Sequence, residues 1–405
     1  MKTSPIIDLH KLAVATHSDV VVFRRYLHSH PELSFEESGT AAYLADRLHD
    51  FGIPFRSGIA GHGLTALIEG RNPDSACIAL RADMDALPIS ETNDTGYRSL
   101  NKGKMHACGH DVHMAVLLGA ASILTKIKDQ FHGTVKLIFQ PAEEKLPGGA
   151  KAMIAEGVLE SPEVQAIVGL HVTPELDAGK IGFHSGPFMA SGDEINIRIN
   201  GKGGHAAMPH RITDTVLTAS QLIVQLQQIV SRMAPPLIPT VLSFGRVIAD
   251  GTHNIIPDEV SINGTLRTFD ESWRDNAKKL IHTFSLHTAE AMGAKAIVDI
   301  IDGYPVLIND PQLIQLLRNA LSDSFTAHDL IDVPQRMTTE DFAWYSQQIP
   351  ACFLRLGTAF ANESQARRLH SSDFDIDESA MLNGTKVMAA AALILLDFFQ
   401  QKNQL

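Results

Sequence analysis

The chain has 405 residues, of which 44% are hydrophobic and 20% are charged, and its formal net charge at pH 7 is -12. This length supports a large hydrophobic core and predicts two domains. The charge argues against nucleic acid as a partner, because phosphate recognition needs clustered Lys and Arg side chains and the sequence has no such run. We expect a small-molecule partner instead.

Cysteine usage and hydropathy bear on the compartment. Only Cys77, Cys108 and Cys352 occur, which argues against a disulfide framework and favours a reducing compartment, so we expect the cytoplasm. Polar residues interrupt the first apolar run, which argues against a signal peptide. The most apolar run, 387–396, is too short for a membrane span of roughly 20 residues and is interpreted as a buried helix.

The first part of the chain alternates helical and strand patterns. Helical periodicity and short apolar runs bounded by Gly, Pro or Asp identify these elements. We expect helices at 7–27, 38–51, 114–128 and 148–156, and strands at 64–69, 76–81, 133–139 and 166–170. This alternation favours an α/β layer architecture.

The pattern changes after Ser191, where residues 194–200 alternate polar and apolar side chains, as in a strand with one exposed face. A helix at 213–232, strands at 240–249 and 259–268, a helix at 272–292 and a strand at 296–301 follow. The order β-α-β-β-α-β is that of a ferredoxin-like unit. We therefore expect an inserted domain at 188–302, with 1–187 and 303–405 forming the other domain.

The strongest chemical signal is the segment 105–113, Met-His-Ala-Cys-Gly-His-Asp-Val-His. It places Cys108 and His110 two residues apart, and thiolate and imidazole are ligands that suit zinc and neighbouring transition metals. A small buried hydrophobe is the alternative for Cys108. The neighbouring histidine favours a metal ligand.

Two adjacent carboxylates, Glu143 and Glu144, follow the expected strand that ends at Phe139. Burying both without partners is unfavourable, and a metal ion would compensate. If Glu144 is a ligand, Glu143 can hold the attacking water and act as general base. A solvated acidic turn is the alternative for this motif alone.

Three further candidates are ambiguous when each is taken singly. His171 directly follows the strand at 166–170, and His370 lies in a Leu-His-Ser segment. A lone histidine at either place is more often structural than a ligand. Asp85, in the run that begins at Arg81, is expected to orient a metal-binding imidazole. An ion pair with Arg81 or a loop cap is the alternative reading of this run.

The inserted domain carries its own candidates. A glycine-rich turn at 201–210 contains His205, and its glycines permit a close backbone approach. By itself the turn is typical of a plain connection. Asn254 and Arg267 are also ambiguous, although an arginine can bind a carboxylate through two parallel hydrogen bonds.

Several motifs in unbroken order resemble the metal-dependent amidohydrolase family of aminoacylases, hippurate hydrolases and indole-acetyl-amino-acid hydrolases. They lie at 28–36, 81–88, 106–111, 140–144, 201–210, 254–257 and 369–371. The resemblance covers nearly the whole chain. It implies an α/β fold with a zinc-peptidase-like three-layer catalytic domain and an inserted ferredoxin-like α+β domain that serves as lid and dimerisation module.

The resemblance also implies a site with two divalent metal ions per subunit, zinc first, with manganese, cobalt or nickel as alternatives. The implied ligands are Cys108, His110, Glu144, His171 and His370. Glu143 would be general base and acid, and Asp85 would orient a ligand. His205 would reach the substrate oxyanion, in its own subunit or in the partner of a homodimer, and Asn254 and Arg267 would receive the substrate carboxylate.

The expected reaction is hydrolysis of the amide bond of an N-acyl amino acid to a carboxylic acid and a free amino acid. A dipeptidase or carboxypeptidase with the same dinuclear centre is one alternative. A non-catalytic metal-binding protein is another. Structural zinc sites usually have four protein ligands and seldom keep a carboxylate pair beside an open position, which favours the enzyme.

Overall fold

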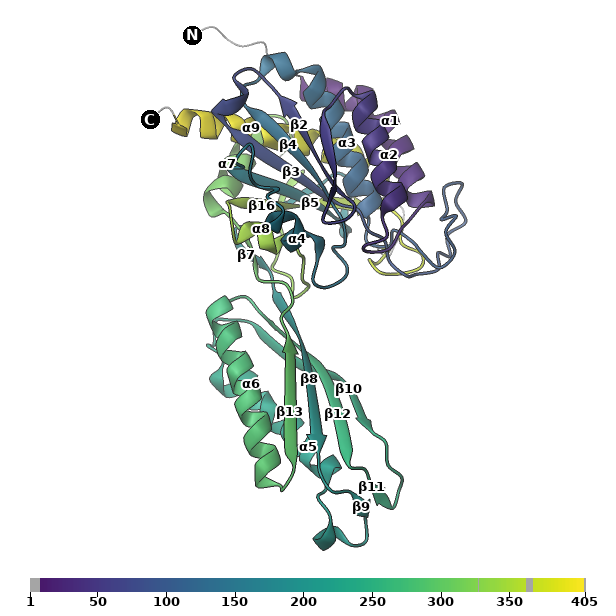
Figure 1. Cartoon of the computed structure of the whole chain (residues 1–405). Helices are drawn as coiled ribbons and strands as arrows, with labels where there is room; N and C mark the ends of the chain where they lie inside the picture. The colour runs from purple at the N-terminus through teal and green to yellow at the C-terminus, as the bar shows by residue number, and fades with distance from the viewer. Residues whose placement is uncertain (1–7, 327, 362–366, 404–405) are drawn as a thin grey trace. The chain divides into compact units, whose positions relative to one another are not determined.

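The computed structural model describes residues 8–326, 328–361 and 367–403, which form two compact units (Figure 1). The first unit holds the described chain up to Gly186 together with Ile308–Pro334 and Trp344–Leu405. The second holds Pro187–Leu307 and Gln335–Ala343.

The segment Gln335–Ala343 falls in the second unit, whereas we expected it in the first. Its backbone explains the difference. The N–H of Arg336 donates to the carbonyl oxygen of Phe188, and the N–H of Ala190 donates to that of Arg336, each at 3.0 Å. A pairing between segments so distant in the chain leaves no local pattern to predict it from.

The first unit is built on an eight-stranded mixed sheet. In spatial order its strands are β1 (Phe55–Ile59), β2 (Gly63–Glu69), β4 (Thr134–Gln140), β3 (Cys77–Asp83), β5 (Ala166–Asp177), β16 (Ala351–Ala359), β6 (Ile181–Phe183) and β15 (Leu330–Asp332). Strand β3 pairs in parallel with β4 and β5, and β5 pairs in parallel with β16. These central strands are almost entirely buried, as expected for a parallel sheet covered on both faces.

One face of this sheet is covered by α1 (Leu9–Ser29), α3 (His110–Lys126) and α9 (Ala380–Asn403). The three helices share one hydrophobic core with strand residues such as Leu80 and Val168. Helix α9 is long and apolar enough to span a membrane by length and composition, but 67% of its most apolar window is buried in the fold. It therefore packs as the core helix that its sequence predicts.

The opposite face is covered by α4 (Gly149–Ala155) and the chain after it. Lys136 of β4 is buried and donates to the carbonyl oxygens of Val158, Glu160 and Pro162 at 3.0, 2.6 and 2.9 Å. Three acceptors satisfy its ammonium group, which ties this covering segment to the sheet. The helix–sheet–helix layering confirms the expected fold class.

The second unit has a four-stranded antiparallel sheet. In spatial order its strands are β10 (Thr240–Ala249), β12 (Glu259–Thr268), β8 (Ser191–Asn200) and β13 (Lys295–Ile301), and the helices α5 (Thr215–Gln228) and α6 (Glu271–Ala291) cover one face. Alternate residues of β8, such as Ile195 and Ile197, are buried under these helices. The β-α-β-β-α-β order confirms the expected ferredoxin-like unit.

Shorter elements complete the two units. They are α2 (Ser38–Asp50), α7 (Pro311–Leu321) and α8 (Ala343–Ser346), the small ladder of β9 (Gly204–His205) with β11 (Ile255–Ile256), and β7 (Gly186–Met189) and β14 (Leu307–Asn309) at the unit boundaries. Most of these short strands carry too few residues to show a periodicity in the sequence.

Two element boundaries differ from expectation where the chemistry lies. Strand β5 continues through His171 to Asp177 because its backbone keeps pairing with β16, so His171 lies inside the strand and not after it. Helix α3 begins at His110 and not at Met114. Its first turn contains buried polar side chains, which hide the apolar periodicity that marks a helix.

Candidate metal centre

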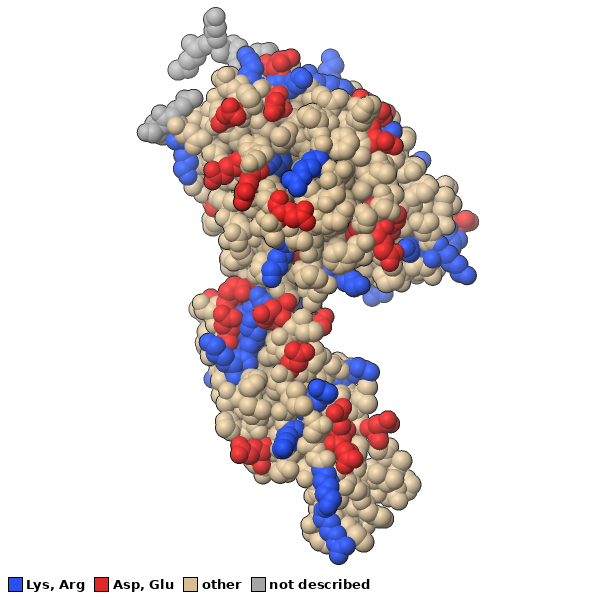
Figure 2. All heavy atoms as spheres, in the orientation of Figure 1, with Lys and Arg blue, Asp and Glu red and all other residues tan. Residues whose placement is uncertain are grey.

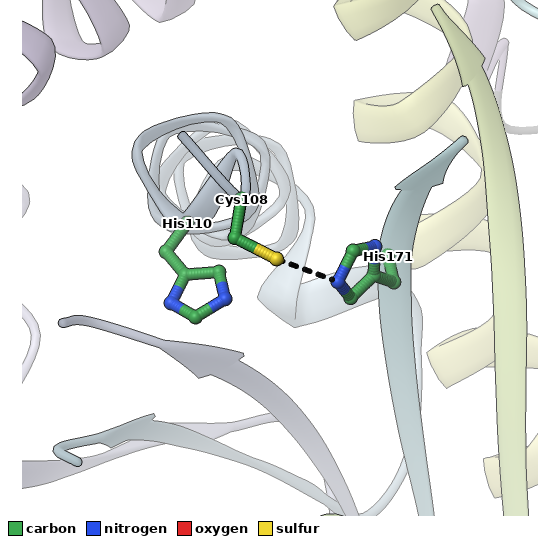
Figure 3. Close-up of side chains that lie close together, drawn as sticks. All are labelled: Cys108, His110 and His171. Carbon is green, nitrogen blue, oxygen red and sulfur yellow. Dashed lines mark hydrogen bonds between the residues drawn. The ribbon is translucent and has the colours of Figure 1, made fainter. Parts of the chain in front are cut away.

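Cys108 lies just before α3 and His110 is the first residue of this helix, and both side chains lie beside His171 on β5 (Figure 3). Gly109 between them has φ 82°, a left-handed conformation that glycine adopts without steric cost. A Cβ at Gly109 would also lie 2.5 Å from a methyl carbon of Val172. Glycine is thus required for the turn that presents both side chains.

His171 is held in the tautomer that a metal ligand needs. Its Nδ1 lies 2.7 Å from the carbonyl oxygen of Val172, so Nδ1 carries the proton and Nε2 presents a lone pair. Nε2 lies 3.5 Å from Sγ of Cys108. Burial, with a smaller effect of Arg355, lowers the pKa of His171 well below its usual value and keeps the ring neutral.

Glu144 and His370 lie on the other side of the cluster. Oε1 of Glu144 is 3.2 Å from Nε2 of His370 and 3.9 Å from Nε2 of His110. The backbone N–H of His370 donates to the carbonyl oxygen of Ala107 at 2.8 Å. This bond ties the loop of His370 to the residue before Cys108.

The structure brings all five sequence-predicted ligands together. Their ligand atoms lie within 4.8 Å of one another in the overlapping groups Cys108/His110/His171, Cys108/Glu144/His370 and His110/Glu143/Glu144. Nε2 of His110 is buried without a hydrogen-bond partner among the described residues. Buried polar atoms are rarely left so, and a sulfur, nitrogen and oxygen donor set suits divalent transition metals. These residues therefore fit a metal ion.

Asp85 lies beneath the loop that carries the two adjacent glutamates. Its Oδ1 accepts the N–H of Glu143 at 3.0 Å, and its Oδ2 accepts the N–H of Glu144 at 2.9 Å and the hydroxyl of Ser34 at 2.6 Å. Oδ1 is also 3.3 Å from Nδ1 of His110. Burial alone would raise the pKa of Asp85, but His110 and these bonds lower it, so the carboxylate is ionised.

Asp83, two residues before Asp85 in the run that begins at Arg81, forms the ion pair with Arg81 that was the alternative reading of this run. Oδ2 of Asp83 accepts a hydrogen bond from Nη1 of Arg81 at 2.7 Å, and Oδ1 lies 2.6 Å from Nδ1 of His113. Nε2 of His113 accepts the N–H of Val172 at 2.9 Å, so both nitrogens of this ring are occupied. His113 therefore anchors β5 beside the cluster. We assigned it no role from the sequence, although its place one helical turn after a candidate ligand was a signal.

A buried ion network lies behind the cluster. The guanidinium of Arg24 contacts Asp111 at 2.8 Å and Asp375 at 2.7 Å. His28 lies between two carboxylates, with Nδ1 2.8 Å from Asp111 and Nε2 3.2 Å from Glu91. Burial and the charge of Arg24 lower the pKa of His28, but the two carboxylates outweigh them and raise it above its usual value, which favours the cationic ring. The sequence indicated no function for this network.

His205 and Asn254 lie together at one end of the second unit. The ladder of β9 and β11 pairs His205 with Ile255, and the N–H of Ala206 donates to the carbonyl oxygen of Asn254 at 3.0 Å. The N–H of Ala207 donates to Nδ1 of His205 at 3.1 Å. Nε2 of this exposed ring therefore carries the proton and can act as a donor.

Arg267 lies at the other end of β12. It pairs with Gly192 near the start of β8, whereas Asn254 precedes Glu259, the first residue of β12. At about 3.3 Å per residue, the strand from Glu259 to Arg267 spans roughly 26 Å. One copy of the chain therefore cannot bring Asn254 and Arg267 to the same small carboxylate.

Thiolate, imidazole and carboxylate donors thus gather beside a buried mixed sheet, with the carboxylate of Glu143 next to His110 and Glu144. This is the arrangement of a metal-dependent hydrolase. The sequence profile of peptidase family M20/M25/M40 matches residues 79–394. The chain belongs to this family, which confirms the family resemblance drawn from its motifs.

Individual relatives match over both units. The chain is 40% identical over 378 residues to N-acetyl-L-cysteine deacetylase of Bacillus subtilis, covering 93% of this chain and 88% of the relative. It is 42% identical over 302 residues to N-acyl-L-amino acid amidohydrolase of Geobacillus stearothermophilus, covering 75% and 81%. The crystal structure of the YXEP protein of Bacillus subtilis, a dinuclear metal binding peptidase from the M20 family, matches with a TM-score of 0.82 and 34% identity, covering 95% of this chain and 99% of that one.

Proposed function

We propose that the protein hydrolyses the amide bond of N-acyl amino acids and releases a carboxylic acid and a free amino acid. The observation that carries this proposal is the meeting of five donor side chains with the neighbouring carboxylate of Glu143. The names of the two relatives described above, a deacetylase and an amidohydrolase of N-acylated amino acids, support the substrate class.

Two divalent ions would be held by Cys108, His110, Glu144, His171 and His370. Zinc is the first choice, with manganese, cobalt or nickel as alternatives, because the donor set does not discriminate among them. When bound, such a pair lowers the pKa of a water molecule and polarises the amide carbonyl.

Glu143 moves the proton. It takes one proton from the attacking water as the water oxygen bonds to the amide carbon, and it delivers that proton to the leaving nitrogen as the carbon–nitrogen bond breaks. The second hydrogen stays on the carboxylic acid. Asp85 supports this role by holding the backbone of Glu143 through Oδ1, and it faces Nδ1 of His110, which leaves Nε2 for the metal.

The protein would act as a homodimer whose second unit contributes to the site of the other copy. Asn254 lies before the first residue of β12 and Arg267 lies near its last residue, so a shared carboxylate would require two copies. His205 would donate from Nε2 to the carbonyl oxygen of the substrate. Strand β10 is an edge strand on which Val247 and Ile248 are 50% and 40% exposed, and such an edge can pair with a second copy.

The substrate would be a small molecule, and the protein would work in a reducing compartment such as the cytoplasm. Figure 2 shows acidic and basic side chains interspersed on the face in view, with no continuous basic surface there for nucleic acid. The three cysteines are free and buried. They suit a compartment in which disulfides do not form.

The direct test is amino-acid release from N-acetyl, N-benzoyl and indole-acetyl amino acids by metal-quantified protein. We expect release from at least one of them, loss of release with a chelator, and recovery when a divalent metal is restored. Dipeptides and longer peptides belong in the same panel. Cleavage of peptides alone would establish the peptidase instead, and no cleavage by metal-loaded protein would leave a metal-binding protein without catalysis.

A further inference from the structure

Glu37 stands at the N-terminus of α2 but does not cap the helix. Its side chain is 0% exposed and makes no hydrogen bond to the first turn. Glu32 caps the helix instead, accepting the N–H groups of Gly39 at 3.0 Å and Thr40 at 2.7 Å. The carboxylate of Glu37 therefore points into the protein interior.

The inward carboxylate of Glu37 accepts the backbone N–H of Ala142 at 2.8 Å. Ala142 is fully buried and has φ 52°, a left-handed conformation that is unusual for a residue with a Cβ. Its carbonyl oxygen accepts the N–H of Gly149 at 3.0 Å, which closes the loop. A strained backbone of this kind persists only where its surroundings hold it.

Ala142 immediately precedes the two glutamates of the candidate centre. Three consecutive N–H groups are thus each bound by a buried carboxylate, Ala142 by Glu37, and Glu143 and Glu144 by Asp85. The two bonds to Asp85 have an ionised acceptor, and such hydrogen bonds are shorter and stronger than those between neutral groups. Together they determine the direction in which the side chains of Glu143 and Glu144 leave the backbone.

Backbone N–H groups, that of Ala142 among them, lower the pKa of Glu37, but they do not outweigh the effect of its burial. Its Oε2 is buried without a hydrogen-bond partner among the described residues. Burial, and to a lesser extent the neighbouring charge of Asp85, raises the pKa of Glu37 to about 7. Because burying such a carboxyl is unfavourable, stability alone does not account for a glutamate here.

We propose that Glu37 is a positioning residue for the hydrolysis: by accepting the N–H of Ala142 it holds the loop that aims Glu143 and Glu144. The inference rests on the proposed function. It assigns the effect to a hydrogen-bond acceptor at one place, and not to a negative charge.

Three substitutions separate these properties. Glu37→Gln keeps an acceptor and removes the charge, Glu37→Met keeps the length without an acceptor, and Glu37→Asp keeps the charge but withdraws the acceptor. We expect Met and Asp to lower kcat by about 10- to 100-fold with KM within about twofold, because small misplacements of catalytic groups have effects of that size. Gln should keep kcat within about twofold of wild type. The matched control is Glu36→Met, because Glu36 is an exposed neighbour that pairs with Lys104.

Backbone amide hydrogen exchange gives a readout that needs neither metal nor activity. In metal-free protein, we expect the peptide covering 140–148 to exchange faster in Glu37→Met and Glu37→Asp than in Glu37→Gln or wild type, while the strand 77–83 is unchanged. Unfolding of a variant would instead speed exchange in both segments, and the comparison then rests on Glu37→Asp and Glu37→Gln.

The outcomes distinguish the two proposals. Wild type that is inactive on the whole panel would refute the function, whereas the exchange result would still report on the loop. Active wild type together with unchanged kcat and exchange in Glu37→Met and Glu37→Asp would overturn the positioning role. A loss of kcat in Glu37→Gln as large as that in Glu37→Met would also overturn the positioning role.

Discussion

Nε of Arg24 lies 2.8 Å from Oδ2 of Asp111, and both side chains are completely buried. Asp111 follows His110 at the start of α3. The same guanidinium reaches Asp375 at 2.7 Å, in the segment after His370. A single cation from α1 thus joins two segments that carry proposed metal ligands from opposite halves of the chain.

Replacing Arg24 with methionine would leave Asp111 and Asp375 buried without this cation. We expect Arg24→Met to lower the free energy of unfolding by about 3 to 5 kcal/mol, because breaking a buried ion pair leaves an uncompensated charge. Urea unfolding of the metal-free protein measures this. Arg25→Met is the control, since Arg25 is half exposed and pairs with Glu378, and it should change stability by less than about 1 kcal/mol. Equal stability of the two variants would contradict the prediction.

Removing the proposed proton carrier should separate metal binding from turnover. Glu143→Gln cannot take a proton from water, and we expect it to keep its metal and lose kcat by about 100- to 10,000-fold. Metal analysis and kcat on the same sample provide the check. Turnover comparable to wild type would refute the role of Glu143.

Loss of the thiolate should reduce the number of metal ions bound. Cys108→Ala removes a proposed ligand, so we expect lower metal content after desalting and a parallel loss of activity. Cys352→Ala is the control because Cys352 is equally buried but lies on β16 and in none of the ligand groups. Full metal occupancy in Cys108→Ala would exclude this residue as a ligand.

If His205 of one copy contributes to the site of the other copy, two inactive variants should complement each other in a mixed dimer. Glu143→Gln and His205→Ala should each be nearly inactive. After subunit exchange a mixed dimer holds one site with both groups intact, so a 1:1 mixture should recover about a quarter of wild-type activity if pairing is random. Light scattering establishes the dimer. The control mixes Glu143→Gln with the double variant Glu143→Gln/His205→Ala. Every subunit in this mixture lacks Glu143, so no site is complete. No recovery from exchanged dimers would place His205 in its own subunit's site.

Glu37 predicts an unusual dependence of stability on pH. Its pKa is raised from an ordinary value near 4.5 to about 7 in the folded protein. Between these values the folded state holds more protons than the unfolded state, so stability falls as pH rises. We expect the metal-free Glu37→Gln variant to gain stability relative to wild type from pH 5 to pH 8, by about 2 to 3 kcal/mol. Urea unfolding at both pH values tests this, and a constant difference would contradict it.

Helices and strands were largely predictable because their periodicity is a local property. Helix α6, expected at 272–292, runs from Glu271 to Ala291, and strand β10 has the expected bounds. Predicted boundaries were wrong where buried polar side chains interrupt the apolar periodicity, as in the first turn of α3. The short strands and the placement of Gln335–Ala343 depend on pairing with distant segments, which leaves no periodic signal.

The amino-acid sequence by itself indicated the side chains to which we assign the chemistry: the Cys-Gly-His turn, the adjacent glutamates and the scattered histidines are recognisable from donor type and order. The tertiary structure decided what each carboxylate does. Asp83 pairs with Arg81 and His113, Asp85 holds the backbone of the glutamate loop, and Glu37 turns away from its own helix. The physical reason is that a buried carboxylate is stabilised by whichever donors surround it, and those donors come from distant segments.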